Sequence, residues 1–123
     1  MILRYVFIFL TFAYLANCSG NSNKNELSNQ NEFSPPEIQF TQAMLMFDNQ
    51  QYELATNKFK NIERIYPLSN EAIQSQIMLG FINYILLDYD TAIFQFSRII
   101  NKYPSLKNID YVYYMKALCF YEQ

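Results

Sequence analysis

Few side chains in this 123-residue chain suit catalysis. The sequence has no histidine, two cysteines and two glycines, so it cannot build a Ser-His-Asp triad, a histidine-based zinc site or a glycine-rich phosphate loop. Asp88 and Asp90 come closest to a catalytic carboxylate pair, but they flank Tyr89 at a predicted hairpin turn, where helix capping and solvation explain them. The sequence therefore predicts a protein that is not an enzyme and that uses no cofactor, metal or small-molecule substrate.

The thiol of Cys18 is the remaining candidate for chemistry. It follows Leu15, Ala16 and Asn17, and this pattern is similar to a bacterial lipobox, in which the signal is removed and the cysteine sulfur carries a diacylglyceryl group. Asn17 departs from the Gly, Ala or Ser that usually precedes the cysteine. Because each buried CH₂ contributes about 0.8 kcal/mol, several acyl chains anchor a protein stably. We expect Cys18 to be the lipidation site, with a buried structural cysteine as the alternative.

The residues around Cys18 support this expectation. Residues 1–17 hold one early charge, Arg4, and then an apolar run of about 12 residues, which spans roughly 18 Å as a helix and is shorter than a roughly 30 Å hydrocarbon core. This pattern predicts a signal peptide at 1–17, with an uncleaved membrane anchor as the alternative. Residues 18–34 are rich in Asn and Ser, which predicts a flexible tether. Inner-membrane lipoproteins often carry Asp at the position after the cysteine. This chain has Ser19 there, which favours localisation in the outer membrane.

The composition indicates a packed domain. Hydrophobic residues make up 51% and aromatic residues 18% of the chain, which is too apolar for disorder. The net charge of −2 and the lack of a Lys/Arg cluster exclude the electrostatic footprint that a nucleic acid needs.

The rest of the chain repeats at an offset of 37 residues. The repeat maps Tyr52, Ala55, Phe59, Ile62, Tyr66 and Pro67 onto Tyr89, Ala92, Phe96, Ile99, Tyr103 and Pro104. Such spacing puts the repeated residues on one stripe of a helix that ends before the proline, and we expect that stripe to form core.

A second helix precedes each of these stripes. The predicted first helices (A helices) run from Glu37 to Asn49, from Asn70 to Leu87 and from Asp110 to Tyr121, and Ala43, Gly80 and Ala117 mark where helices approach closely. Ser34 begins a predicted capping box, and Ser69 and Asn108 are the predicted caps of the later A helices.

Alternating helices with these small and aromatic positions follow the tetratricopeptide (TPR) pattern, lengthened from 34 to 37 residues. The predicted fold is all-α, a TPR α-solenoid of antiparallel helical hairpins over residues 35–123. Repeat 1 covers about 35–67, repeat 2 about 68–104, and the first helix of repeat 3 about 108–121.

Two stretches of the sequence resemble a particular family of repeat proteins. Asn108 to Leu118, with its Asn-Ile-Asp-Tyr start, resembles the third A helix of the BamD (YfiO/ComL) family of outer-membrane β-barrel assembly lipoproteins. Tyr66-Pro-Leu-Ser69 and the following Gln74-Ser-Gln76 are similar to the family's passage into the second repeat. The resemblance covers only the N-terminal half of the family, so its C-terminal contacts with the large barrel subunit are not carried over. Gln50 and Leu87 stand at turn positions where the family often has Gly-Asp, which predicts less ideal turns.

The resemblance implies a lipid-anchored scaffold on the periplasmic face of the bacterial outer membrane, as part of the β-barrel assembly machinery. Its implied partners are β-barrel assembly subunits and the C-terminal signals of nascent outer-membrane proteins. A solenoid binds such extended segments on the concave face that its A helices line. The predicted groove residues, taken as exposed A-helix positions, are Gln39, Gln42, Gln76, Asn83, Tyr84, Tyr111 and Tyr114.

Two alternatives stay open at this point. The chain is an envelope TPR lipoprotein of another kind, an adaptor for peptidoglycan enzymes, secretion or efflux, or it is a truncated, non-functional fragment of the assembly factor. The stretch from Asn108 to Leu118 disfavours the adaptor.

Overall fold

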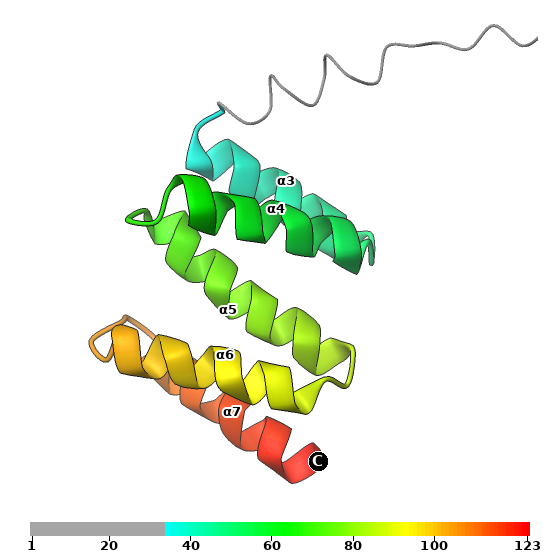
Figure 1. Cartoon of the computed structure of the whole chain (residues 1–123), viewed down its shortest axis with the longest axis vertical. Coiled ribbons are helices and arrows are strands. Elements are labelled where there is room, and N and C mark those ends of the chain that lie inside the picture. The colour runs from blue at the N-terminus through cyan, green and yellow to red at the C-terminus, as the bar shows by residue number, and fades with distance from the viewer. Residues whose placement is uncertain (1–33) are drawn as a thin grey trace, which may run out of the picture. The chain divides into compact units, whose positions relative to one another are not determined.

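The computed structural model describes residues 34–123, which form one all-helical unit (Figure 1). Its helices are α3 (Pro36–Asp48), α4 (Tyr52–Ile65), α5 (Asn70–Ile85), α6 (Tyr89–Lys102) and α7 (Ile109–Glu122). They confirm the all-α hairpin architecture, and the three A helices begin and end within two residues of the expected positions. The predicted signal peptide, Cys18 and nearly all of the predicted tether lie outside the described residues.

The two kinds of helix differ in where their apolar residues lie. Helices α4 and α6 are strongly amphipathic, whereas α3, α5 and α7 carry apolar residues around most of their circumference. An amphipathic helix packs its apolar face on the core and exposes its polar face to solvent, whereas a helix that is apolar all round is enclosed by neighbours on several sides. The A helices α3, α5 and α7 therefore form the inner row of the solenoid, and the B helices α4 and α6 the outer row.

Helix packing follows this division. Each helix packs against the next along the chain, and α3 also contacts α5, as α5 contacts α7 (Figure 1). The backbones of α4 and α6 stay apart, and an ion pair of 2.7 Å between Glu63 and Arg98 joins them. Close A helices and separated B helices bend a solenoid so that the A helices line the concave side.

The repeated stripe forms the core, as expected. Ala55, Phe59 and Ile62 in α4 are fully buried, and so are their counterparts in α6 at 92, 96 and 99. The small residues Ala43 and Gly80 are also buried. A Cβ atom built on Gly80 would lie 2.7 Å from Cε1 of Phe96, so the helices α5 and α6 touch at this point.

The expectation for Ala117 is wrong. It is exposed, although it occupies the same repeat position as Ala43 and Gly80. The aromatic side chain that covers this position in the second unit, Phe96, comes from the B helix that follows. Within residues 34–123 no helix follows α7 to supply such a side chain to Ala117.

Both turns inside a hairpin end the A helix with the same motif. The N–H of Gln50 donates to Phe47 O and that of Gln51 to Met46 O, both at 2.9 Å, which is the Schellman pattern. Leu87 and Asp88 repeat it after α5. Gln50 and Leu87 have φ values of 60° and 62°, a left-handed conformation that glycine adopts more readily. These turns are therefore less ideal, as predicted.

The helix caps agree with the sequence in one case out of three. Ser69 Oγ accepts a hydrogen bond from Ala72 N at 3.0 Å and caps α5, as expected. Ser34 forms no capping box, because α3 begins after Pro35, and Ser34 O instead accepts bonds from Gln39 Nε2 and Tyr66 Oη. Asn108 stands at the N-cap of α7 with φ 66°, and its side chain makes no capping bond.

Candidate functional site

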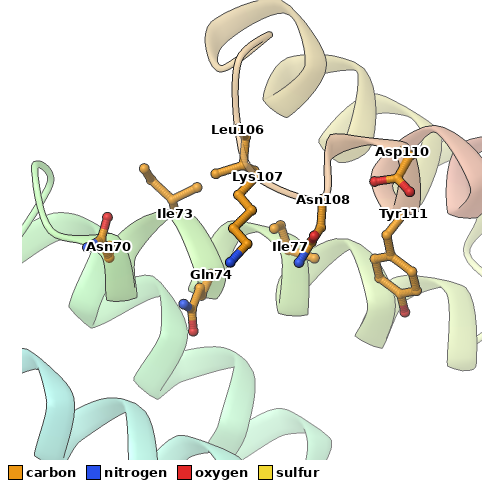
Figure 2. A pocket seen from close by; sticks show the side chains of 9 residues that line it. All are labelled: Asn70, Ile73, Gln74, Ile77, Leu106, Lys107, Asn108, Asp110 and Tyr111. Carbon is orange, nitrogen blue, oxygen red and sulfur yellow. The ribbon is translucent and has the colours of Figure 1, made fainter.

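An open cleft of about 670 Å³ lies between α5 and α7 on the concave side (Figure 2). Helix α5 contributes one wall, the loop before α7 contributes the rim, and the first turn of α7 closes the other side. The apolar lining comes from the side chains of Ile73, Ile77, Leu106 and the ring of Tyr111, and the polar lining from Asn70, Gln74, Lys107, Asn108 and Asp110.

The repeat explains which residues reach this groove. Gln74 and Ile77 lie three residues apart on one face of α5, and the 37-residue offset maps them onto Tyr111 and Tyr114 in α7. Three of these four equivalent positions, Gln74, Ile77 and Tyr111, line the cleft. An extended segment lying across it would meet both helices.

The loop between α6 and α7 is held by its own backbone. Leu106 N donates to Tyr103 O at 3.0 Å, and Ile109 N donates to Leu106 O at 3.1 Å. The left-handed Asn108 then starts α7. These bonds hold Lys107 at the rim, and Figure 2 shows its side chain extending toward α5.

Three tyrosines of α5 and α7 were expected in the groove, and one of them, Tyr111, lines the cleft. Tyr111 and Tyr114 are 45% and 61% exposed. Partial burial raises the pKa of Tyr111, and the nearby phenol of Tyr114 adds to the shift. The ring of Tyr84 lies 6.3 Å from Phe81 and 5.8 Å from Tyr89, and desolvation followed by the charge of Glu122 raises its pKa. Phenol rings with neutral hydroxyls offer flat, partly apolar surfaces for stacking and hydrogen bonding.

The predicted exposure of two groove residues is wrong. Gln39 is 0% and Gln76 2% exposed. Each stands four residues before a small residue, Ala43 or Gly80, and therefore lies one turn away on the same helix face, which packs against the B helix. Gln39 Nε2 donates to Ser34 O at 2.8 Å, so its amide stabilises the start of α3.

Gln42 and Asn83 are half-buried and do not line the cleft. Gln42 Oε1 accepts a hydrogen bond of 3.1 Å from Lys58 Nζ, which ties α3 to α4. The carbonyl oxygen of Asn83 accepts from Asp88 N in the turn after α5. Of the expected groove residues in the described part of the chain, Tyr111 lines the cleft, whereas Tyr84 and Tyr114 are not among its lining residues.

Sequence reasoning missed most of the cleft. The residues that it overlooked are Asn70, Ile73, Gln74, Ile77, Leu106, Lys107, Asn108 and Asp110. The repeat offset itself identifies two of them, because stepping back 37 residues from Tyr111 and Tyr114 leads to Gln74 and Ile77. No sequence pattern places the rim residues, whose positions depend on the loop.

The two acidic residues considered for catalysis have structural partners. Asp88 Oδ1 accepts from Thr91 N at 3.2 Å and caps α6, and Asp90 Oδ1 accepts from Gln123 Nε2 at 2.6 Å. In the described part of the chain, acidic and cysteine side chains form no cluster of three that would hold a metal ion. None of the helices between residues 34 and 123 is long and apolar enough to cross a membrane.

Comparisons with known proteins show which family this chain matches. The profile of the YfiO family, described as "Outer membrane lipoprotein", matches residues 34–123. The outer membrane protein assembly factor BamD of Caulobacter vibrioides is 30% identical over 114 residues, which are 93% of this chain and 37% of that protein. The assembly factors of the same name from Rickettsia prowazekii and Pasteurella multocida are 23% and 27% identical, over 87% and 93% of this chain. The chain spans 37 to 41% of the length of these relatives.

Proposed function

The chain belongs to the YfiO family of outer membrane lipoproteins, and from this premise we propose that it is a lipid-anchored TPR scaffold of the outer-membrane β-barrel assembly machinery. Lipid on Cys18 holds it at the periplasmic face of the outer membrane. Its concave groove binds extended segments of nascent outer-membrane proteins or of partner subunits. Its role is binding rather than catalysis, in agreement with relatives that are named assembly factors.

The cleft between α5 and α7 is the observation that carries the proposal. Its wall of Ile73, Ile77 and Leu106 suits apolar side chains, and the carboxamides of Asn70 and Gln74 suit backbone N–H and C=O groups. A transmembrane β-strand alternates apolar and polar side chains. Such a segment therefore carries apolar side chains that suit the apolar wall and polar groups that suit the carboxamides.

The groove is wide enough to accept a chain that has not yet folded. About 670 Å³ falls within the range of sites that hold several side chains. The exposed phenols at 111 and 114 extend the surface along α7. Aromatic residues contribute most to such interfaces because they bury a large area with little loss of side-chain entropy.

A pair of matched variants tests the groove. Tyr114 and Phe94 are 61% and 63% exposed, but the repeat offset pairs Tyr114 with Ile77 of the cleft wall, whereas Phe94 lies on the outer helix α6. The full chain in detergent is titrated with a urea-unfolded outer-membrane β-barrel protein, and binding is followed by fluorescence anisotropy. Tyr114→Ser should weaken binding about fivefold, whereas Phe94→Ser should leave it unchanged. Equal effects of the two substitutions would contradict the groove as the binding site.

Membership of the family also separates this proposal from an adaptor for peptidoglycan, secretion or efflux systems, which the relatives' names do not favour. Affinity purification of the full chain from detergent-extracted membranes distinguishes them directly. A β-barrel assembly subunit should co-purify. Recovery of peptidoglycan enzymes or efflux components in its place would favour the adaptor.

A further inference from the structure

Charge is distributed unevenly between the two ends of the helices. The turns inside the hairpins, at 49–51 and 86–88, lie on one side of the domain together with the end of α7, and we call this the turn side (Figure 1). Its carboxylates, within residues 34–123, face no basic residue in the last turn of any A helix. They belong to Asp48, Glu53, Asp88, Asp90 and Glu122. An anionic surface therefore repels the turn side.

The connections between repeats, at 66–69 and 103–108, lie on the opposite side, which we call the loop side (Figure 1). Arg64 and Lys102 lie in the last turns of α4 and α6, and Lys107 lies in the second connection. Glu63, also at the end of α4, is paired with Arg98. The remaining carboxylates of this side are in the first turns of the A helices, at Glu37, Glu71 and Asp110. The loop side is therefore close to neutral, and it approaches an anionic surface more favourably than the turn side does.

Leu68 projects from the loop side with 98% of its surface exposed. Its turn is fixed by a hydrogen bond of 2.9 Å from Ser69 N to Tyr66 O. The repeat offset maps Leu68 onto Ser105, which is also exposed, so the fold does not require an apolar side chain at this position. An apolar side chain held in solvent beside cations suits the interface of a lipid bilayer, where the apolar group inserts and the charged groups stay among the headgroups.

The chain also enters the domain on the loop side. Ser34 O accepts a hydrogen bond of 2.9 Å from Tyr66 Oη, which places the start of the domain beside the first connection. The 16 residues from Cys18 to Ser34 can span at most roughly 55 Å. A lipid on Cys18 would therefore keep the loop side at a high local concentration near the bilayer.

Resting on the lipid anchor of the proposed function, we propose that the loop side docks on an anionic phospholipid surface. Leu68 inserts into the interface, and Lys102 and Lys107 lie at the lipid phosphates. The turn side then points away from the membrane. A lipid on Cys18 does not by itself decide which side of the domain faces the bilayer, whereas this contact does. Because residues 106–108 of the cleft rim belong to the loop side, the docked cleft opens next to the membrane.

The chain has no tryptophan, so a single added indole reports its own depth in a bilayer. Leu68→Trp places the indole on the loop side, and Leu86→Trp places it on the turn side, at the exposed C-cap of α5. The full lipidated chain is reconstituted in vesicles of phosphatidylethanolamine and phosphatidylglycerol, with or without bromine on the acyl chains. Bromine quenches an indole that reaches the acyl region. The indole at 68 should be quenched and emit at shorter wavelength, whereas the indole at 86 should show neither change.

A second reporter, Ser105→Trp, separates the contributions of Leu68 and of the cations. In that background Leu68→Ser should lower the ratio of docked to undocked chains about tenfold, because the burial of one leucine side chain is lost. Lys102→Gln should lower it about fivefold, and high salt should remove this difference. Lys116→Gln, in the middle of α7, should leave the ratio unchanged. Circular dichroism checks the fold, which Leu68→Ser should preserve because serine already stands at the equivalent position 105.

Flotation of the vesicles separates this proposal from the one on which it rests. If the chain floats with the vesicles but neither indole is quenched, the docking is wrong while the anchor stands. If the chain does not float, the anchor fails and the docking fails with it. Equal quenching of the indoles at 68 and 86 would overturn a fixed orientation. Shielding of the indole at 68 only after a β-barrel assembly subunit is added would assign the loop side to a protein partner instead.

Discussion

Adding one methyl group at Gly80 should destabilise the domain, although alanine is the better helix former. Gly80 lies inside α5, where Gly→Ala alone stabilises a helix by about 0.8–1.0 kcal/mol. The added Cβ would lie 2.7 Å from Cε1 and 3.0 Å from Cζ of Phe96, distances that require the ring to move. Phe96 is fully buried and has little space in which to move.

The magnitude follows from these two opposing effects. Overpacking of a close-packed core costs about 1–3 kcal/mol, which exceeds the helix gain. We expect Gly80→Ala to lower the free energy of unfolding by about 1 kcal/mol. For a domain of this size that corresponds to a fall in melting temperature of about 4–8 °C.

The assay is thermal and urea unfolding of the full chain in detergent, followed by circular dichroism. Ala43, the equivalent residue of the first unit, provides the matched control because α3 already accommodates a Cβ at this position. Ala43→Gly should destabilise by about 1 kcal/mol, through helix propensity alone. Gly80→Ala and Ala43→Gly are opposite exchanges at the same repeat position, and each is expected to lower the free energy of unfolding.

A double-mutant cycle with Phe96→Leu locates the cause. Removing the ring edge removes the clash, so Gly80→Ala should become neutral or stabilising in that background. If Gly80→Ala stabilises the original chain, the close approach of α5 to Phe96 is refuted. If its cost is the same with leucine at 96, the cost has another source.

Three further predictions concern a turn, the dependence on pH and the anchor. Leu87 is 70% exposed with φ 62°, so Leu87→Gly should raise the unfolding free energy by about 0.5–1 kcal/mol, measured by urea unfolding; no gain would contradict the strained turn. The pKa of Tyr84 is raised in the folded state, so its contribution to the free energy of unfolding should be fully present below the unfolded pKa of about 10 and should be lost as the pH rises through the folded pKa. Tyr84→Phe should therefore reduce the loss of stability that unfolding curves show between neutral and alkaline pH. Cys18→Ser should release the chain from the membrane fraction and abolish the lipid mass of the mature chain, whereas unchanged retention would favour an uncleaved anchor.

The fold was predictable because its determinants are local and repeated. The spacing of Ala55, Phe59 and Ile62, and its recurrence after 37 residues, fixes one buried stripe for each B helix. The proline after each stripe sets where that helix ends. The less ideal turns at Gln50 and Leu87 were likewise predictable, because a left-handed cap favours glycine and the sequence lacks glycine there.

The groove residues were only partly predictable, because an A helix that is apolar all round does not reveal which side faces outward. Gln39 and Gln76 are polar and were expected at the surface, yet they share a face with Ala43 and Gly80 and are buried against the B helices. Tyr111 and Tyr114 were identified correctly as exposed. The same offset would have added Gln74 and Ile77.

The sequence by itself determined the helices, their order, the repeat and the buried stripe of each B helix, since each depends on neighbours within a few turns of the same helix. Only the tertiary structure decided the cleft. It depends on the distance between α5 and α7, which the packing of α6 against both of them sets, and on a loop whose hydrogen bonds bring Lys107 to the rim. Contacts between residues more than 30 positions apart leave no local pattern, so the place where a ligand meets the chain emerged only when the helices were assembled.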